Sequence, residues 1–93
     1  MPAAMSLVYI PCTFKDGMFS TEYAVTVHDL SGEEISFFAD RGLVRDGSQP
    51  LLRVRFLGPS EEPPTGIVVL LPGSAMDVER RYLRVREDDL VAA

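Results

Sequence analysis

The sequence predicts an all-β domain, a small antiparallel barrel or sandwich of about six strands. Short runs rich in Val, Ile, Leu, Phe and Tyr recur along the chain and alternate with polar residues, and seven glycines and seven prolines punctuate the sequence around them. The 93 residues suffice for one hydrophobic core. The predicted strands are 7–14, 19–28, 34–40, 50–57, 66–71 and 80–86. We expect a single domain over 7–90, a disordered extension over 1–6 and a tail over 91–93.

The first two strands are joined at Asp16-Gly17, a dipeptide typical of a two-residue type I′ hairpin. This turn fixes which residues lie opposite one another, and the pairs place apolar side chains together on one face. The predicted pairs are Phe14 with Phe19, Cys12 with Thr21, Ile10 with Tyr23, and Val8 with Val25.

The next turn is predicted to be a three-residue loop, Leu30 to Gly32, with Gly32 in the left-handed region. A two-residue loop would mix apolar with polar positions, because a slip of one residue turns every side chain to the other face. We therefore expect residues 7–40 to form a three-stranded meander. Its predicted core face is Val8, Ile10, Cys12, Phe14, Phe19, Tyr23, Val25, Val27, Ile35 and Phe37.

The second half of the chain predicts another three-stranded unit. Strand 50–57 points Leu52, Val54 and Phe56 inward and Arg53 and Arg55 outward. Segment 58–66 is rich in proline, and we expect it to be an unpaired, mobile surface loop. Strand 66–71 is apolar on both faces, and Val68 and Leu70 point away from Ile67, Val69 and Leu71 and form a second apolar strip. Strand 80–86 points Leu83 and Val85 inward and Tyr82, Arg84 and Arg86 outward. The two meanders would stack or close on each other.

The stretch Ile67-Val-Val-Leu-Leu-Pro, followed by Arg81-Tyr-Leu-Arg-Val-Arg-Glu-Asp-Asp-Leu90, resembles the last hairpin and final short turn of SH3-like small barrels. The resemblance covers this C-terminal part of the chain and favours a closed barrel. The chain has no Trp and lacks the aromatic opening motif of peptide-binding SH3 domains. The resemblance therefore bears on fold and leaves function open.

Charge is unevenly distributed along the chain, whose formal net charge is −5. Residues 1–46 contain three basic and seven acidic residues, whereas 49–86 contain six arginines and four acids. The acidic total opposes non-specific nucleic-acid binding as the main function. The longest apolar run, Ile67–Leu71, is too short to span a membrane. A single cysteine and the absence of a visible signal peptide favour a cytoplasmic protein.

Catalytic and metal-binding motifs are missing from the sequence, so we expect no enzyme, no cofactor and no metal site. Cys12 and His28 are the sole members of their types, and the predicted register places them on opposite faces of one sheet. Glu22 and Asp40 are predicted to lie opposite each other on the outer face. Two carboxyls that share a site are the one arrangement here compatible with acid–base catalysis.

Three functional hypotheses follow. The leading one is a non-enzymatic interaction and assembly module that binds a protein partner or itself. Its apolar centre would be the outer row Tyr9, Ala24 and Phe38 or the strip Val68 and Leu70; alternatively, a terminus or loop 41–48 covers the row. The second is a nucleic-acid module whose basic face is Arg53, Arg55, Arg84 and Arg86, with Tyr82 stacking on a base. The third is an enzyme based on Glu22 and Asp40.

Overall fold

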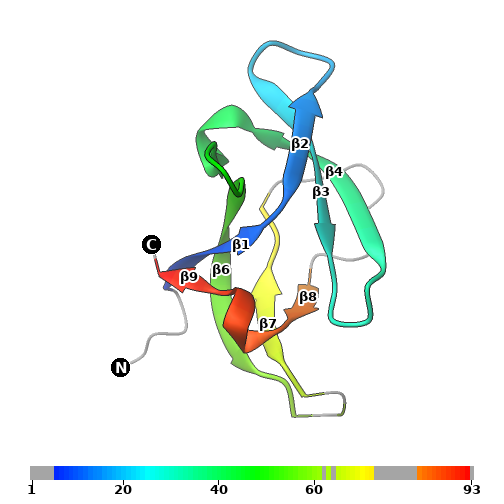
Figure 1. Cartoon of the computed structure of the whole chain (residues 1–93), viewed down its shortest axis with the longest axis vertical. Helices are drawn as coiled ribbons and strands as arrows, with labels where there is room; N and C mark the ends of the chain where they lie inside the picture. Colours follow the sequence, from blue (N-terminus) through cyan, green and yellow to red (C-terminus); the bar gives the residue numbers. More distant parts are fainter. Residues whose placement is uncertain (1–5, 62, 64, 73–81, 93) are drawn as a thin grey trace.

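A computed structural model describes residues 6–61, 63, 65–72 and 82–92. The chain is all-β and forms two antiparallel sheets (Figure 1). One sheet has six strands in the order β8-β7-β6-β1-β9, with β5 also paired to β6; the other is the meander β2-β3-β4. The bounds are β1 Leu7–Pro11, β2 Thr13–Asp16, β3 Glu22–His28, β4 Glu34–Asp40, β5 Val44–Arg45, β6 Leu51–Pro59, β7 Ile67–Leu70, β8 Tyr82–Val85 and β9 Val91–Ala92, with 3-10 turns η2 Arg41–Leu43 and η3 Glu87–Asp89.

The predicted first strand divides between the two sheets at Cys12. Its first part, β1, pairs with β6, and its second part, β2, pairs with β3. At the bend, the Cys12 backbone N–H donates to the Pro50 carbonyl at 3.0 Å. Pro11, just before it, has no N–H to donate to a sheet neighbour. The predicted C-terminal meander is confirmed, because β6, β7 and β8 pair in sequence order. The predicted N-terminal meander is wrong in its first part, because β1 joins the sheet of β6, β7 and β8 and leaves β2, β3 and β4 as the second sheet. The two sheets stay open, so the favoured closed barrel is not formed.

The predicted register of the first hairpin is also wrong. Phe14 lies opposite Val25 instead of Phe19, because residues 17–21 form a longer loop and Gly17 does not adopt the positive φ of a type I′ turn. Phe19 is in this loop and is 67% exposed, so it is not a core residue. The shift is an even number of residues, so Phe14 still shares the inner face with Val25.

The predicted turn between β3 and β4 is confirmed. Val27 pairs with Ile35, Val25 with Phe37 and Tyr23 with Ala39. The Asp29 N–H donates to the Glu33 carbonyl at 3.0 Å and closes the three-residue loop, in which Gly32 has φ +92°. The Asp29 side chain stabilises this loop, because its Oδ1 accepts hydrogen bonds from the backbone N–H groups of Ser31 and Glu33.

The first residues of the predicted loop 58–66 are paired. Gly58 pairs with Val68 and Pro59 with Ile67, and Ser60 N–H donates to the Gly66 carbonyl at 2.7 Å. A bulge between Phe56 and Gly58, with Gly58 at φ +142°, lets the strand continue past the irregularity. The expectation of an unpaired loop is therefore wrong for the beginning of the segment.

Both sheets pack their inner faces onto one core, as the inward positions predict. The buried apolar side chains come from both sheets and from the bend between them: Ile10, Cys12, Val25, Val27, Phe37, Ala39, Leu52, Val54, Val69, Leu71, Leu83 and Val85. Val91 and Ala92, at the start of the expected tail, pair with β1 as β9. The expected extension falls largely on residues 1–5, which are outside the described residues, and the Ser6 carbonyl accepts from the Phe56 N–H at 2.8 Å.

Candidate functional site

The outer side of the six-stranded sheet, here called the large-sheet face, carries most of the predicted site residues. One row crosses four strands: Leu7 on β1 lies opposite Arg55 on β6, Arg55 opposite Leu70 on β7, and Leu70 opposite Tyr82 on β8. A neighbouring pair on β7 and β8 is Val68 with Arg84. The residues predicted as an apolar strip and those predicted as a basic face therefore lie together on one surface.

Several apolar side chains of the large-sheet face remain in contact with solvent. Tyr82 is 65% exposed and Leu7 40%, while Val68 and Leu70 are half-buried. The arginines of the face lie between them, Arg53 half-buried and Arg55 and Arg84 exposed; Arg86, just beyond β8, is exposed too. The outward orientations predicted for these residues are confirmed.

The large-sheet face contains a small notch next to β6. One edge of β6 pairs with β1. On the other edge, β5 pairs with the first residues of β6 and β7 pairs with its later residues, which leaves a gap between β5 and β7 beside Arg53 and Val54. A cavity of about 370 Å³ lies here. Arg53 and Arg55 line it, and the other residues around this notch are mainly apolar: Leu7, Leu43, Val54, Leu70, Leu71 and Pro72.

Tyr9 belongs to this sheet, so the predicted row of Tyr9 with Ala24 and Phe38 is wrong. The cause is the pairing of β1, which contacts β6 and β9 instead of β3; Tyr9 lies opposite Arg53 and Val91. The Arg45 guanidinium carbon also lies 4.2 Å from the centre of the Tyr9 ring. A cation–π contact therefore covers a ring that was predicted to be open.

Ala24 and Phe38 remain neighbours on the outer side of the meander, here called the meander face. Ala24 pairs with Phe38, and Glu22 pairs with Asp40 as predicted. Phe38 is 36% exposed, Asp40 is exposed and Glu22 is half-buried. Asp40 has a structural role, because its Oδ1 accepts the Gly42 N–H at 2.8 Å and caps η2. We call Glu22, Ala24, Phe38 and Asp40 the Phe38 patch.

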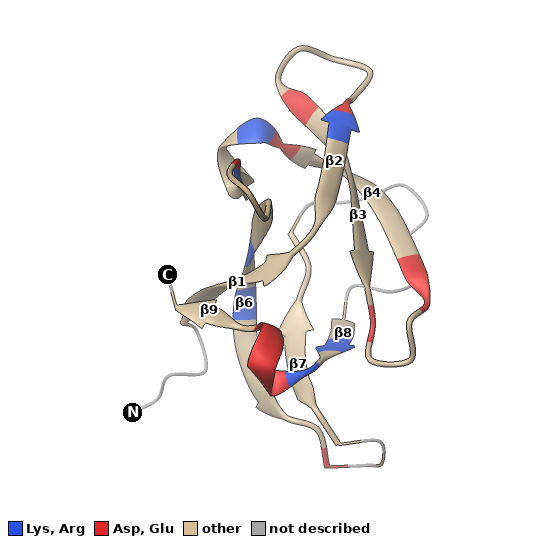
Figure 2. Ribbon diagram, viewed as in Figure 1, with Lys and Arg blue, Asp and Glu red and all other residues tan. Residues whose placement is uncertain are grey.

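The strands of the two sheets carry opposite charge (Figure 2). The strands of the six-stranded sheet contain four arginines, Arg45, Arg53, Arg55 and Arg84, and no acidic residue. The strands of the meander contain four acids, Asp16, Glu22, Glu34 and Asp40, and one basic residue, Lys15, apart from His28. The uneven charge of the sequence is thus also a separation in space.

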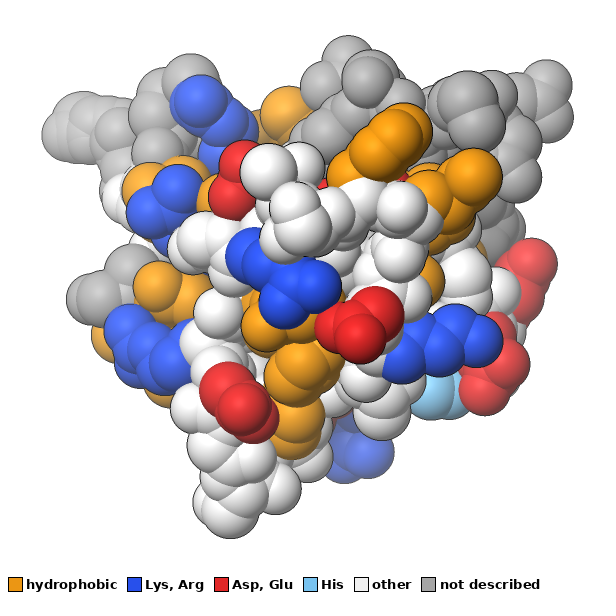
Figure 3. Space-filling model, turned by 90° about the horizontal axis from the view of Figure 1, so that it is seen from above, with side chains coloured by type: hydrophobic (Ala, Val, Ile, Leu, Met, Phe, Trp, Pro, Cys, Tyr) orange, Lys and Arg blue, Asp and Glu red, His pale blue; other side chains and the backbone are white. Residues whose placement is uncertain are grey.

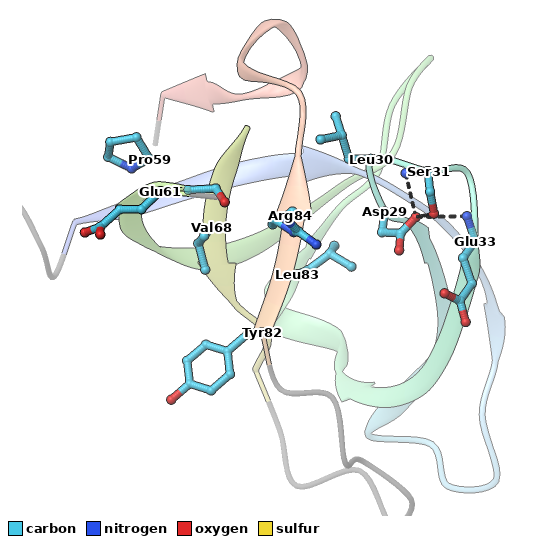
Figure 4. Close-up of a pocket in the computed structure, with 11 residues that line it drawn as sticks. Asp29, Leu30, Ser31, Glu33, Pro59, Glu61, Val68, Tyr82, Leu83 and Arg84 are labelled. Carbon is cyan, nitrogen blue, oxygen red and sulfur yellow. Dashed lines mark hydrogen bonds between the residues drawn. The ribbon is translucent and has the colours of Figure 1, made fainter. Parts of the chain in front are cut away.

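A wider groove of about 700 Å³ lies beside β8 (Figure 4). The β3–β4 loop forms one wall, and the Leu30 N–H donates to the Arg84 carbonyl at 2.8 Å, which ties the loop to β8. Figure 4 shows Tyr82 pointing away from Asp29 and Glu33 of this loop. Tyr82 and Val68 thus continue the large-sheet face up to the groove.

Cys12 and His28 do not form a catalytic pair. Cys12 is buried in the core, and burial raises the pKa of its thiol from 9.0 to about 11. His28 is exposed on the meander face, where its Nε2 lies 3.2 Å from Glu34 Oε2. Among the described residues, no group of three His, Cys, Asp or Glu side chains could hold a metal ion.

One cluster at the end of the meander is not predicted by any sequence pattern. The Arg41 guanidinium carbon lies 4.2 Å from the centre of the Tyr23 ring, and its Nη2 donates to Asp16 Oδ1 at 3.1 Å. Phe14 packs on Tyr23 with ring centres 4.5 Å apart. Figure 3 looks onto this end of the molecule and shows hydrophobic side chains between basic and acidic ones. Arg41 and Arg45 lie in the predicted loop 41–48, and no local signal in the sequence places them over aromatic rings.

Comparison with the models of known protein families, with curated proteins and with solved structures finds no match for this chain. In the part of the chain that the structure describes, no helix has the length and hydropathy needed to cross a membrane. The function proposed below therefore rests on the geometry of the described residues. A sheet face with exposed apolar and Tyr side chains between arginines has the composition of a binding surface.

Proposed function

We propose that this protein is a non-enzymatic interaction and assembly module that associates with itself through the large-sheet face, in the cytoplasm. The observation that carries the proposal is the row Leu7–Arg55–Leu70–Tyr82, which continues across four strands. Apolar side chains in such a row lose contact with water when a partner covers them, and this burial favours association.

The composition of the face supports this proposal. Tyr and Arg are enriched at the energetic centres of protein interfaces, because both combine a large apolar contact area with hydrogen-bonding capacity. Tyr82 and Arg55 are such residues here, and both are exposed. A sheet framework also holds these side chains in place before binding, which lowers the entropic cost of association.

Sedimentation velocity over a range of protein concentrations tests the proposal. We expect the wild-type sedimentation coefficient to rise with concentration and Leu70→Asp to remain monomeric, because a carboxylate would be desolvated in the interface. Ser48→Asp is the control, since it adds the same charge at an exposed position in the segment after β5. A wild-type protein that stays monomeric at its highest soluble concentration would overturn the proposal, as would association that Leu70→Asp leaves unchanged.

A second candidate function is supported by one observation: four residues of the predicted basic face, Arg53, Arg55, Tyr82 and Arg84, lie on one side of one sheet, and Arg86 follows just beyond β8. Such a face fits single-stranded nucleic acid, with Tyr82 stacking on a base. The net charge of −5 opposes this binding. A salt titration with a labelled single-stranded RNA decides: affinity that falls steeply with salt supports it, and no binding at low salt removes it.

A further inference from the structure

The separation of charge between the two sheets suggests which surface the large-sheet face contacts. This inference rests on the proposed function and adds the identity of the partner. The strands of the six-stranded sheet hold arginines and no acids, and the strands of the meander hold mainly acids. A second copy of the same chain therefore offers a surface of complementary charge. Such complementarity selects a partner and fixes its orientation.

The notch and the Phe38 patch also match in chemistry. The notch has apolar side chains, Leu7 and Leu70 among them, next to Arg53 and Arg55. The Phe38 patch has one exposed aromatic ring beside two carboxylates, Glu22 and Asp40, which lie opposite each other.

The spacing of the charged groups is compatible with contact between the two surfaces. Arg53 and Arg55 are two residues apart on one strand, so their Cα atoms are roughly 6.5–7 Å apart on the same face. Glu22 and Asp40 are directly opposite on neighbouring strands, which places their Cβ atoms about 4.5–5.5 Å apart. Long side chains bridge this difference, and a guanidinium binds a carboxylate through two hydrogen bonds. Each carboxylate would then have its own arginine.

We propose that the Phe38 patch of a second copy docks on the notch of the large-sheet face. The Phe38 ring would contact the Leu7 and Leu70 side chains, and the two carboxylates would pair with Arg53 and Arg55. Because the two contacting surfaces differ, the interface is head-to-tail. It therefore produces a ring if the rotation closes and an open chain if it does not.

The remaining charges near the Phe38 patch are compatible with this arrangement. Lys15 lies in the same row, opposite Ala24 on the side away from Phe38. Glu34 adds an acid to the meander face and is within 3.2 Å of His28. Apart from His28, the face has more acidic than basic side chains, with Glu22, Glu34 and Asp40 against Lys15.

A charge-swap experiment tests the partner directly by sedimentation velocity. Variant one is Arg53→Glu with Arg55→Glu, which makes the notch acidic; variant two is Glu22→Arg with Asp40→Arg, which makes the Phe38 patch basic. We expect each variant alone to associate at least about tenfold more weakly than wild type, since like charges then meet. We expect an equimolar mixture to associate again, because each notch then meets a patch of opposite charge.

Two controls separate this specific contact from a general charge effect. Glu87→Arg with Asp88→Arg makes the same change of charge as variant two on exposed residues of η3, and Ser48→Asp adds a negative charge at an exposed position outside the notch. We expect both to associate within about twofold of wild type, because screening weakens distant charges. Two-dimensional ¹⁵N NMR spectra verify that each variant is folded, and Arg55→Gln and Phe38→Ala replace any double variant that is not, each with weaker association expected.

The outcomes separate the partner from the proposed function. If variant two associates as wild type does while Leu70→Asp does not, the large-sheet face is the contact surface but the Phe38 patch is not its partner, and the inference is overturned. A mixture that remains monomeric also overturns it, as does a control that weakens association as much as variant two. If wild type itself never associates, the proposed function fails, and the inference with it. Head-to-tail docking is supported if each charge-swap variant associates weakly on its own, their mixture associates again, and both controls associate as wild type does.

Discussion

The outer faces of the two sheets differ in the contacts that their side chains make within the chain. On the meander face, polar groups meet one another across the strands: the Thr26 and Ser36 hydroxyls are 2.8 Å apart, and His28 lies 3.2 Å from Glu34. On the large-sheet face, the corresponding row alternates apolar side chains with Arg55.

This difference indicates which surface is suited to binding. Cross-strand polar pairs satisfy hydrogen-bonding groups within the chain and gain little from a partner. Exposed leucine and tyrosine side chains gain from being covered. The meander contributes one feature of the second kind, Phe38, which lies next to the Glu22–Asp40 pair. The comparison thus favours the large-sheet face as the main surface and the Phe38 patch as its complement.

The largest effect should distinguish the inner from the outer side of one strand. Val69 has no exposed surface, whereas the neighbouring Val68 is half-buried on the large-sheet face. We expect Val69→Asp to destabilise the fold by at least about 4 kcal/mol, because it places a carboxylate in the core. Val68→Asp should cost about 1 kcal/mol and weaken self-association. Urea unfolding followed by circular dichroism measures both, and equal losses of stability would show that β7 has no outer side.

The pH dependence of stability tests the bend between the sheets. The pKa of the Cys12 thiol is about 11 in the folded chain and 9.0 as the ordinary value. Below 9.0 both states hold the proton; as the pH rises to 11, the unfolded chain loses it while the folded chain retains it, so stability falls. We expect wild type to lose about 2 kcal/mol more over this range than Cys12→Ala.

Urea titrations of the two proteins at several pH values give this difference. Tyr and Lys titration affects both proteins alike, so Cys12→Ala removes it from the comparison. Parallel stability curves for the two proteins would contradict a buried thiol at the bend.

A smaller effect should come from the turn that sets the meander register. Gly32 has φ +92°, and Gly47 has no such backbone conformation; neither would meet another atom through an added Cβ. We expect Gly32→Ala to destabilise the fold by about 1 kcal/mol and Gly47→Ala to have almost no effect. Thermal unfolding of the two variants measures the difference, and equal midpoints would argue against the left-handed turn.

The smallest effect should separate the two arginines that stack on tyrosines. Arg41 contacts Tyr23 and also pairs with Asp16, whereas Arg45 contacts Tyr9 through the stack. We expect Arg41→Ala to cost about 1 kcal/mol and Arg45→Ala about 0.5 kcal/mol. Urea unfolding at low and high salt measures both values. A larger loss for Arg45→Ala would reverse the ranking of the two contacts.

The two hairpins of the meander show how far the sequence determines the fold. At Leu30–Gly32 the competing registers differ by one residue. A two-residue loop would pair Phe37 with Thr26 and put Val25 and Phe37 on opposite faces, so the hydrophobic pattern selects the three-residue loop. At Asp16-Gly17 the true register differs from the predicted one by an even number of residues. The side chains point to the same faces in both registers, so the hydrophobic pattern does not distinguish between them. Inner and outer faces were therefore predictable where the pairing was not.

The candidate site shows the same limit. Alternation alone identifies the outward side of Arg53 and Arg55, and in the wholly apolar strand 66–71 it shows only that Val68 and Leu70 share one face. That these residues share one face with Tyr9 depends on the pairing of β1 with β6, which joins residues far apart in the chain. The pairing depends on packing of the whole core, so no local pattern reports it. The notch has the same origin, since it lies between two neighbours of β6 from different parts of the chain.

The most direct measurement is a series of ¹⁵N NMR spectra of the wild-type protein at increasing concentration. If the large-sheet face is the contact surface, the shifts that move with concentration include those of Arg55, Leu70 and Tyr82. Spectra that do not change with concentration, or shifts that avoid β6, β7 and β8, would contradict this account.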